Sequence, residues 1–80
     1  MINLKNAEKI KESQPYYWQM LVEIATEEME WLKSPSKKLD EKRIKRFQKL
    51  HNGLIKHQII NTGSSKTSLL EDLEVLAKIS

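Results

Sequence analysis

Apolar residues recur at spacings of three, four and seven along most of the chain, the pattern of amphipathic helices rather than strands. The chain has only two glycines and two prolines, and no alternating run of β-branched and aromatic residues bounded by turns. Breaks at Pro15, 34–36 and 61–65 divide it into a short first segment and three longer ones. The pattern predicts an all-α protein, a small helical bundle of three main helices plus a short N-terminal helix or arm.

The first segment, 3–12, has only three residues that could form an apolar stripe: Leu4, Ala7 and Ile10. A helix of this length is marginal unless other elements pack on it. We expect either a short helix that covers one end of the core or, at residues 1–12, a loosely attached arm.

The second segment, 14–33, is predicted to be a helix with two apolar faces; Ser13 and Pro15 suit its entrance. The first face is a core stripe that a single polar residue, Glu28, interrupts: Tyr17, Met20, Leu21, Ile24 and Trp31. The second face is rotated from it by more than a quarter turn and consists of Trp18, Val22, Ala25 and Met29.

Two interpretations of the second apolar face remain open. In the first, this helix is central and its own neighbours cover it on both sides. In the second, the face binds a protein partner or a second copy of the chain, with Trp18 as the large anchor that such surfaces favour. A domain of this size has few other helices with which to cover both faces.

The third segment is predicted to be a helix that begins at Pro35 or at Asp40 and ends near Ile60. Its core stripe consists of Ile44, Phe47, Leu50, Leu54 and Gln58, with Arg43 and His51 on the same arc. A glycine inside a helix costs about 1 kcal/mol relative to alanine, so Gly53 could divide the segment. We expect one continuous or kinked helix, because the stripe keeps its register across the glycine.

Charge is sorted between these two segments. Residues 35–60 carry eight basic and two acidic residues, a net charge of +6, whereas the whole chain has a net charge of only +3. Residues 14–33 carry four acidic residues and one basic residue. On a helical wheel, Lys38, Lys42, Lys45, Lys49 and Lys56 lie nearly opposite the core stripe, in a row about 27 Å long at 1.5 Å per residue.

Such a row has three interpretations: an ordinary solvated face, a surface for a polyanion, or a surface for an anionic membrane or an acidic protein groove. The near absence of acidic residues on this face supports the polyanion interpretation, because a merely soluble helix usually carries both signs of charge, but the solvated face stays open. The predicted nucleic-acid contacts are Lys38, Lys42, Lys45, Arg46, Lys49 and Lys56. Lysine contacts phosphate well but lacks arginine's planar fork, so we expect modest sequence preference, contributed by Arg46, Gln48, Asn52 and Gln58 if they reach base edges.

The last segment is predicted to be a helix from Leu69 to Ile79, opened by Ser68 and Glu71 at the spacing of a capping box. Its core face consists of Leu69, Leu70, Leu73, Leu76 and Ala77. The preceding linker is not a phosphate-binding loop, because no glycine stands directly before its lysine and no apolar strand precedes it.

The sequence gives little support for a catalytic function. The chain has no cysteine, so it has neither disulfides nor a cysteine zinc site. His51 and His57 are six residues apart and lie on different faces of a helix, where they cannot chelate a metal ion together. The acidic residues Glu27, Glu28 and Glu30 have no visible substrate pocket. We expect no enzyme activity, no catalytic residue, no cofactor or metal, and no small-molecule substrate.

Residues 1–80 are enough for one domain. The chain contains no apolar run of the roughly 18 to 20 residues that a membrane span needs, and its charged start predicts a soluble, cytoplasmic protein. The first predicted function is a small nucleic-acid-binding or regulatory protein that uses the basic helix, as a dimer formed through the face of Trp18. The alternative is a protein–protein interaction module, for example an inhibitor, an antidote or an assembly component.

Overall fold

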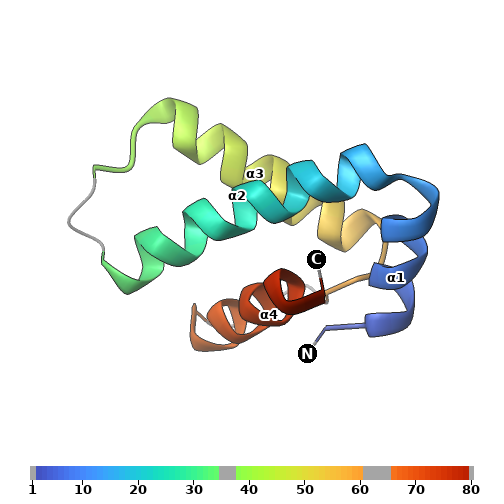
Figure 1. Cartoon of the computed structure of the whole chain (residues 1–80). Coiled ribbons are helices and arrows are strands. Elements are labelled where there is room, and N and C mark those ends of the chain that lie inside the picture. Colours follow the sequence, from blue (N-terminus) through green and yellow to red (C-terminus); the bar gives the residue numbers. More distant parts are fainter. Residues whose placement is uncertain (1, 35–37, 61–65, 80) are drawn as a thin grey trace.

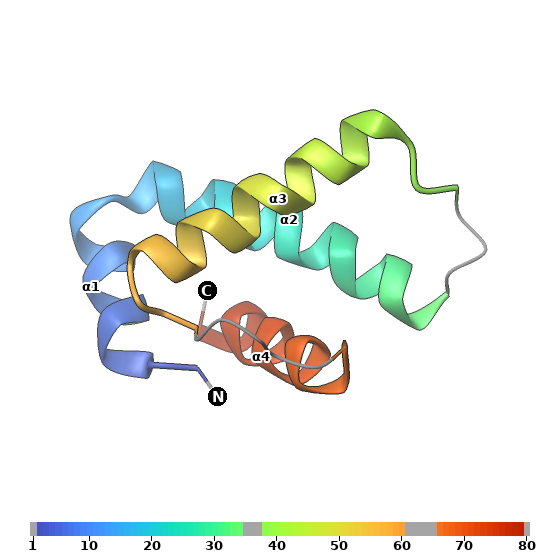
Figure 2. The same ribbon diagram turned by 180° about the vertical axis from the view of Figure 1, so that it is seen from behind.

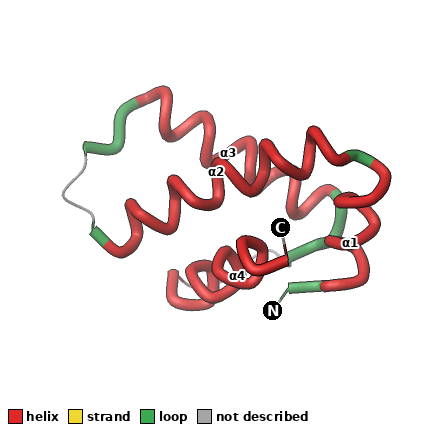
Figure 3. The backbone as a smooth tube through the Cα atoms, viewed as in Figure 1, coloured by secondary structure: helices red, strands yellow, loops and turns green. Residues whose placement is uncertain are grey.

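The computed structural model describes residues 2–34, 38–60 and 66–79. Within these ranges the chain forms four helices and no strand (Figure 3). The helices are α1 (Leu4–Ser13), α2 (Pro15–Lys33), α3 (Glu41–Lys56) and α4 (Lys66–Ile79). The predicted all-α bundle of three main helices and a short first helix is therefore confirmed.

Helix α2 is the centre of the bundle and contacts each of the other three helices. Helices α3 and α4 each run antiparallel to it, and α1 lies across the end where α2 begins and α3 ends (Figures 1 and 2). An element with neighbours on several sides needs apolar residues on several faces. This position explains why the sequence of α2 has two apolar faces instead of one.

The second apolar face of α2 is used largely by the chain's own core. Trp18 is 4% exposed, Ala25 is fully buried and Met29 is 9% exposed, whereas Val22 is half-buried. The fully enclosed large side chains of the core come from α2, α3, α4 and the turn after α3: Leu21, Ile24, Leu50, Leu54, Ile59, Leu73 and Leu76. Three of the four residues predicted as a partner surface therefore lie inside the single chain.

Helix α1 is attached to the turn that follows α3. The side-chain oxygen of Asn3 accepts a hydrogen bond from the Asn6 backbone N–H at 3.1 Å and so caps the helix. The backbone N–H of Asn3 donates to the Ile59 carbonyl at 2.7 Å, and the side-chain amide of Asn6 donates to the Gln58 carbonyl at 3.0 Å. Ala7, on the inner face of α1, is fully buried. The first segment is thus a docked helix.

Helix α3 begins at the later of its two predicted starts. Asp40 is the N-cap, and its Oδ1 accepts a hydrogen bond from the Arg43 backbone N–H at 2.8 Å. The alternative start, Pro35, lies outside the described residues. The helix continues through Gly53 without a break, as expected. Ile44, predicted to belong to the core stripe, is 40% exposed, because it lies at the solvent edge of that stripe.

The end of α3 differs from the prediction. The helix ends at Lys56, and Gln58 has a left-handed backbone with φ of 57°. The Ile59 N–H donates to the Leu54 carbonyl and the Gln58 N–H to the Ile55 carbonyl, the two bonds of a Schellman motif. Gln58 is therefore exposed and does not extend the core stripe, while Ile59 folds back into the core.

Helix α4 begins earlier than predicted. Its first residue is Lys66, so Ser68 lies within the first turn and is not the N-cap. The residues before it, 61–65, lie outside the described residues. Leu73 and Leu76 are buried against α2 as the core stripe predicts.

Candidate nucleic-acid interface

Four of the six predicted nucleic-acid contacts form a row on the outward side of α3. We call Lys42, Lys45, Lys49 and Lys56 the lysine row; all four are exposed. The opposite side of the helix carries the buried residues Phe47, Leu50 and Leu54. At 1.5 Å per residue the row is about 21 Å long.

Lys38 does not belong to this row. It is exposed, but it lies in the loop before α3, because the helix begins only after the Asp40 cap. The sequence prediction had extended the helical period to Lys38 and so made the row longer than it is. Lys38 adds a cation before the first turn of α3, at no fixed position on the helical wheel.

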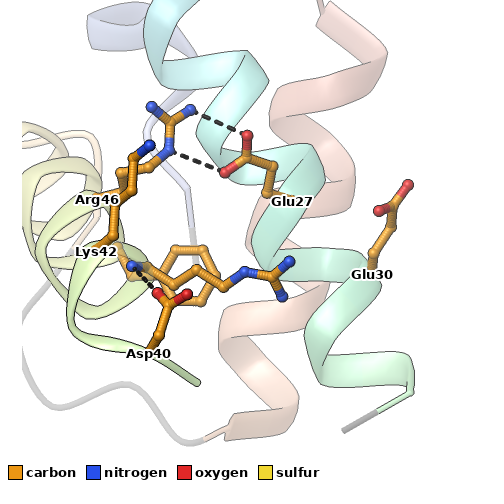
Figure 4. A pocket seen from close by; sticks show the side chains of 7 residues that line it. Glu27, Glu30, Asp40, Lys42 and Arg46 are labelled. Carbon is orange, nitrogen blue, oxygen red and sulfur yellow. Dashed lines mark hydrogen bonds and ion pairs between the residues drawn. The ribbon is translucent and has the colours of Figure 1, made fainter. Parts of the chain in front are cut away.

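Arg46 is paired within the chain. Its Nε lies 3.0 Å from Oε2 of Glu27, and its Nη2 lies 3.0 Å from Oε1 of the same carboxylate (Figure 4). Such a bidentate pair fixes the guanidinium in one geometry. The prediction of Arg46 as a nucleic-acid contact stays a prediction, but its charge is balanced by Glu27 of α2 and its guanidinium is held in this pair.

The Arg46–Glu27 pair lies in a pocket of about 410 Å³ between α2 and α3. We call it the mixed-charge pocket; it is lined by Glu27, Glu30, Asp40, Lys42, Arg43, Arg46 and Phe47 (Figure 4). Its acidic and basic groups are interspersed, so it presents no single sign of charge to a ligand. We infer that attraction between the acidic and basic groups lining this pocket helps to hold α2 against α3.

The lysine row itself is barely neutralised. Lys45 lies 3.7 Å from Glu41 one turn earlier, and both side chains are strongly exposed. An exposed pair of this kind contributes about 0.3 to 0.5 kcal/mol and leaves the lysine free to exchange partners. Lys42, Lys49 and Lys56 have no ion pair within the part of the chain that the structure describes.

A second, shallow and open pocket of about 410 Å³ lies along the lysine row. We call it the lysine pocket; α2 contributes Tyr17, and α3 contributes Lys45, Gln48, Lys49, Asn52, Gly53 and Lys56. Three predicted contacts and two residues predicted to give sequence preference therefore lie around one hollow. Gln48 and Asn52 are exposed.

Tyr17 reaches this pocket because residue 53 is a glycine. A Cβ atom at position 53 would lie far inside contact distance of the Tyr17 Oη and 3.3 Å from a methyl carbon of Leu21. The Tyr17 ring is half-buried, and its edge contacts His57 with ring centres 5.6 Å apart. Sequence reasoning missed Tyr17, which it assigned to the core stripe. A glycine inside a helical pattern signals such a close approach, but it does not say which residue approaches.

No protein-family model, curated protein or solved structure matches this chain. We therefore infer its function from its own side chains. Within residues 2–34, 38–60 and 66–79, no helix is long and apolar enough to cross a membrane, and no three acidic or histidine side chains lie where they could hold a metal ion.

The predicted partner surface is reduced to one edge of α2. A pocket of about 490 Å³ is lined by Lys11, Pro15, Trp18, Gln19, Val22 and Glu23. The indole N–H of Trp18 is buried and has no hydrogen-bond partner among the described residues. Ala25 and Met29, which lie further along α2 and are buried in the core, line no part of this pocket.

The one polar residue on the core stripe of α2 pairs with α3. Glu28 is 3% exposed, and its two carboxylate oxygens lie 2.7 and 2.8 Å from Nε2 of the half-buried His51. A carboxylate accepts only, so the ring N–H of His51 is the donor. His57 lies elsewhere, against Tyr17. Glu28 and His51 therefore form a polar link between two packed helices.

Proposed function

We propose that the protein binds nucleic acid by placing the lysine row of α3 along phosphates. The observation that carries this proposal is a row of four exposed lysines, three of them without an ion pair within the described residues, on a helix whose only acidic residue is Glu41. Phosphate contacts from lysine are electrostatic and supply affinity without reading sequence. Lys38 adds a further cation from the preceding loop.

The main argument against this function is that acidic α2 could neutralise basic α3. The structure has two such contacts among its described residues, from Glu27 to Arg46 and from Glu28 to His51. Both partners on α3 lie on the sides of the helix that face α2. The outward-facing lysines of the row are not neutralised by these contacts with α2, which supports a polyanionic partner.

The test is a titration of labelled oligonucleotides, followed by fluorescence anisotropy at a series of salt concentrations. Four phosphate contacts predict a log–log salt slope of roughly −3 to −4. The variant K42Q/K49Q/K56Q should weaken binding by at least tenfold at low salt and reduce the slope to roughly −1, because one cation of the row remains.

A matched control carries the same change of charge elsewhere. Lys5, Lys9 and Lys78 are exposed residues of α1 and α4. K5Q/K9Q/K78Q should keep most of the affinity and of the salt slope. Equal loss in both variants would show attraction by net charge alone, and no binding of wild-type protein at low salt would exclude the proposed function.

The alternative, a protein–protein interaction module, has less support. Its predicted surface consists of Trp18, Val22, Ala25 and Met29, and only Val22 of these is more than slightly exposed. The pocket beside Val22 is the observation in its favour. Light scattering tests the version in which the partner is a second copy: a dimer that V22E converts to a folded monomer would support it.

A further inference from the structure

We propose that the nucleic-acid ligand is single-stranded and that one unpaired base enters the lysine pocket, while the phosphates on either side of that base contact lysines at the two ends of the pocket. This inference rests on the proposed function and names the form of nucleic acid that fits it.

The first argument is the order of charged and uncharged groups along the pocket. Lys45 and Lys49 lie at one end and Lys56 at the other. Lys49 and Lys56 are seven residues apart, about 10 Å along the helix axis. Between them the lining is uncharged, with Asn52 and Gly53 from α3. A ligand that fits this order has anionic groups at both ends and a neutral group in the middle, as a nucleotide with its two flanking phosphates does.

The second argument is the supply of hydrogen-bonding groups in the uncharged part. Gln48, Asn52 and the Tyr17 hydroxyl line the pocket, and none of them has a hydrogen-bond partner among the described residues. Each amide offers both donors and an acceptor, and a phenol offers one donor and acceptor sites. The edge of a base needs such a mixture, whereas a phosphate needs donors only.

The third argument is the aromatic wall. Proteins that hold single strands combine cations along the backbone with aromatic side chains that contact bases. The half-buried side chain of Tyr17 lines the lysine pocket. It lies against position 53, where glycine has no side chain. Any other residue at that position would place its Cβ against the Tyr17 Oη. The glycine therefore lets the Tyr17 hydroxyl lie against the backbone of α3, which brings this aromatic side chain into the lining of the lysine pocket.

A duplex would not use this hollow. In a duplex the bases are stacked and paired, and a protein reads their edges with side chains that protrude into a groove. A base enters a pocket only after it leaves the stack, which costs a few kcal/mol. A single strand does not have to break pairs, so a shallow site between lysines that contacts a whole base favours single-stranded over double-stranded nucleic acid.

The experiment compares three labelled probes at one low salt concentration. They are a single-stranded DNA of mixed sequence, the same strand closed into a hairpin duplex, and a strand of equal length whose sugars carry no bases. The baseless strand has the same phosphates as the single strand, and the hairpin has a higher charge density, so tighter binding of the single strand than of both would show contact with bases. We expect the single strand to bind at least tenfold more tightly than either of the other two probes.

Variants then locate the base contact. Q48A/N52A should weaken binding of the single strand by roughly tenfold, through loss of two hydrogen-bonding side chains, and leave hairpin binding and the salt slope unchanged. The control is Q19A, which removes an exposed glutamine of α2 outside the lysine pocket and should change nothing. Circular dichroism confirms that all variants stay helical.

The outcomes separate this inference from the proposed function. If the hairpin or the baseless strand binds as tightly as the single strand, or if Q48A/N52A has no effect on the single strand, the inference is wrong. Lysine-dependent binding of all three probes would still support the proposed function. If none of the three probes binds, both proposals fail.

Discussion

The contact between Gly53 and Tyr17 allows a double-mutant test of how α2 and α3 cross. Alanine is normally better than glycine inside a helix, by about 1 kcal/mol. At position 53, however, the added methyl group would collide with the Tyr17 Oη, whereas the next ring carbon, Cζ, would be 3.4 Å away, an ordinary contact. The severe collision therefore depends on a single oxygen atom, which Tyr17→Phe removes, while the tight 3.3 Å contact with the Leu21 methyl carbon remains.

The expected free energies follow from this geometry. Gly53→Ala in the wild-type chain should lower the free energy of unfolding by about 1 to 3 kcal/mol, the usual cost of overpacking. In the Tyr17→Phe chain the same change should raise the free energy of unfolding by at most about 1 kcal/mol, because the helical preference for alanine remains and the tight contact with Leu21 offsets part of it. The coupling energy between the two positions is then on the order of 1 to 4 kcal/mol. Tyr17→Phe alone should cost little, since the hydroxyl has no hydrogen-bond partner among the described residues.

The assay is urea denaturation of the four proteins, followed by far-ultraviolet circular dichroism and analysed as a two-state transition. Equal slopes of free energy against urea concentration would show that the variants unfold from the same fold. If Gly53→Ala destabilises both backgrounds equally, the Tyr17 hydroxyl does not limit the approach of the helices. If it stabilises the wild-type chain, the described contact is wrong.

Three further predictions follow from other contacts. Trp18→Ala should lower the free energy of unfolding, measured by urea denaturation, by about 3 to 5 kcal/mol, because the Trp18 side chain is only 4% exposed. Trp18→Phe should retain the helical fold at room temperature. Glu27→Gln should free the guanidinium of Arg46, so that anisotropy titrations show tighter binding of oligonucleotides and a salt slope steeper by roughly 0.7 to 0.9; unchanged binding would mean that Arg46 does not reach the ligand. Gln58→Gly should raise the urea midpoint and increase the free energy of unfolding by about 1 kcal/mol, because a left-handed φ of 57° costs a non-glycine residue about that much.

The helices could be predicted because their apolar periodicity survives in the packed structure. The stripe of Phe47, Leu50 and Leu54 is buried as its spacing requires, and α3 passes through Gly53. The end of α3 could not be predicted in this way. Gln58 occupies the position where glycine is the usual signal, and Ile59 continues an apolar pattern while it reverses the chain. Periodicity cannot distinguish an apolar residue that closes a Schellman motif from one that extends a helix.

The candidate site was predicted in part. Position on a helical wheel located the exposed lysines, because exposure on α3 depends only on the angle from the core stripe. The wheel could not show that Arg46 is paired, since Glu27 is 19 residues away in the sequence. It also could not show that Tyr17 reaches the surface of α3. Both features depend on the crossing of two helices, which no single segment encodes.

The basic residues of α3 differ in type as well as in position, and the difference matches two roles. Arg46 points toward α2, where its planar fork meets both oxygens of one carboxylate in a fixed geometry. The four basic residues on the outward side of α3 are all lysine. Lysine has a flexible stem and a single charged atom, so it can contact a phosphate in many orientations. An exchange of these types should therefore harm both roles. Arg46→Lys would loosen the link to Glu27 and lower stability, while arginine in the lysine row would add forks that read guanine and would narrow the range of sequences bound.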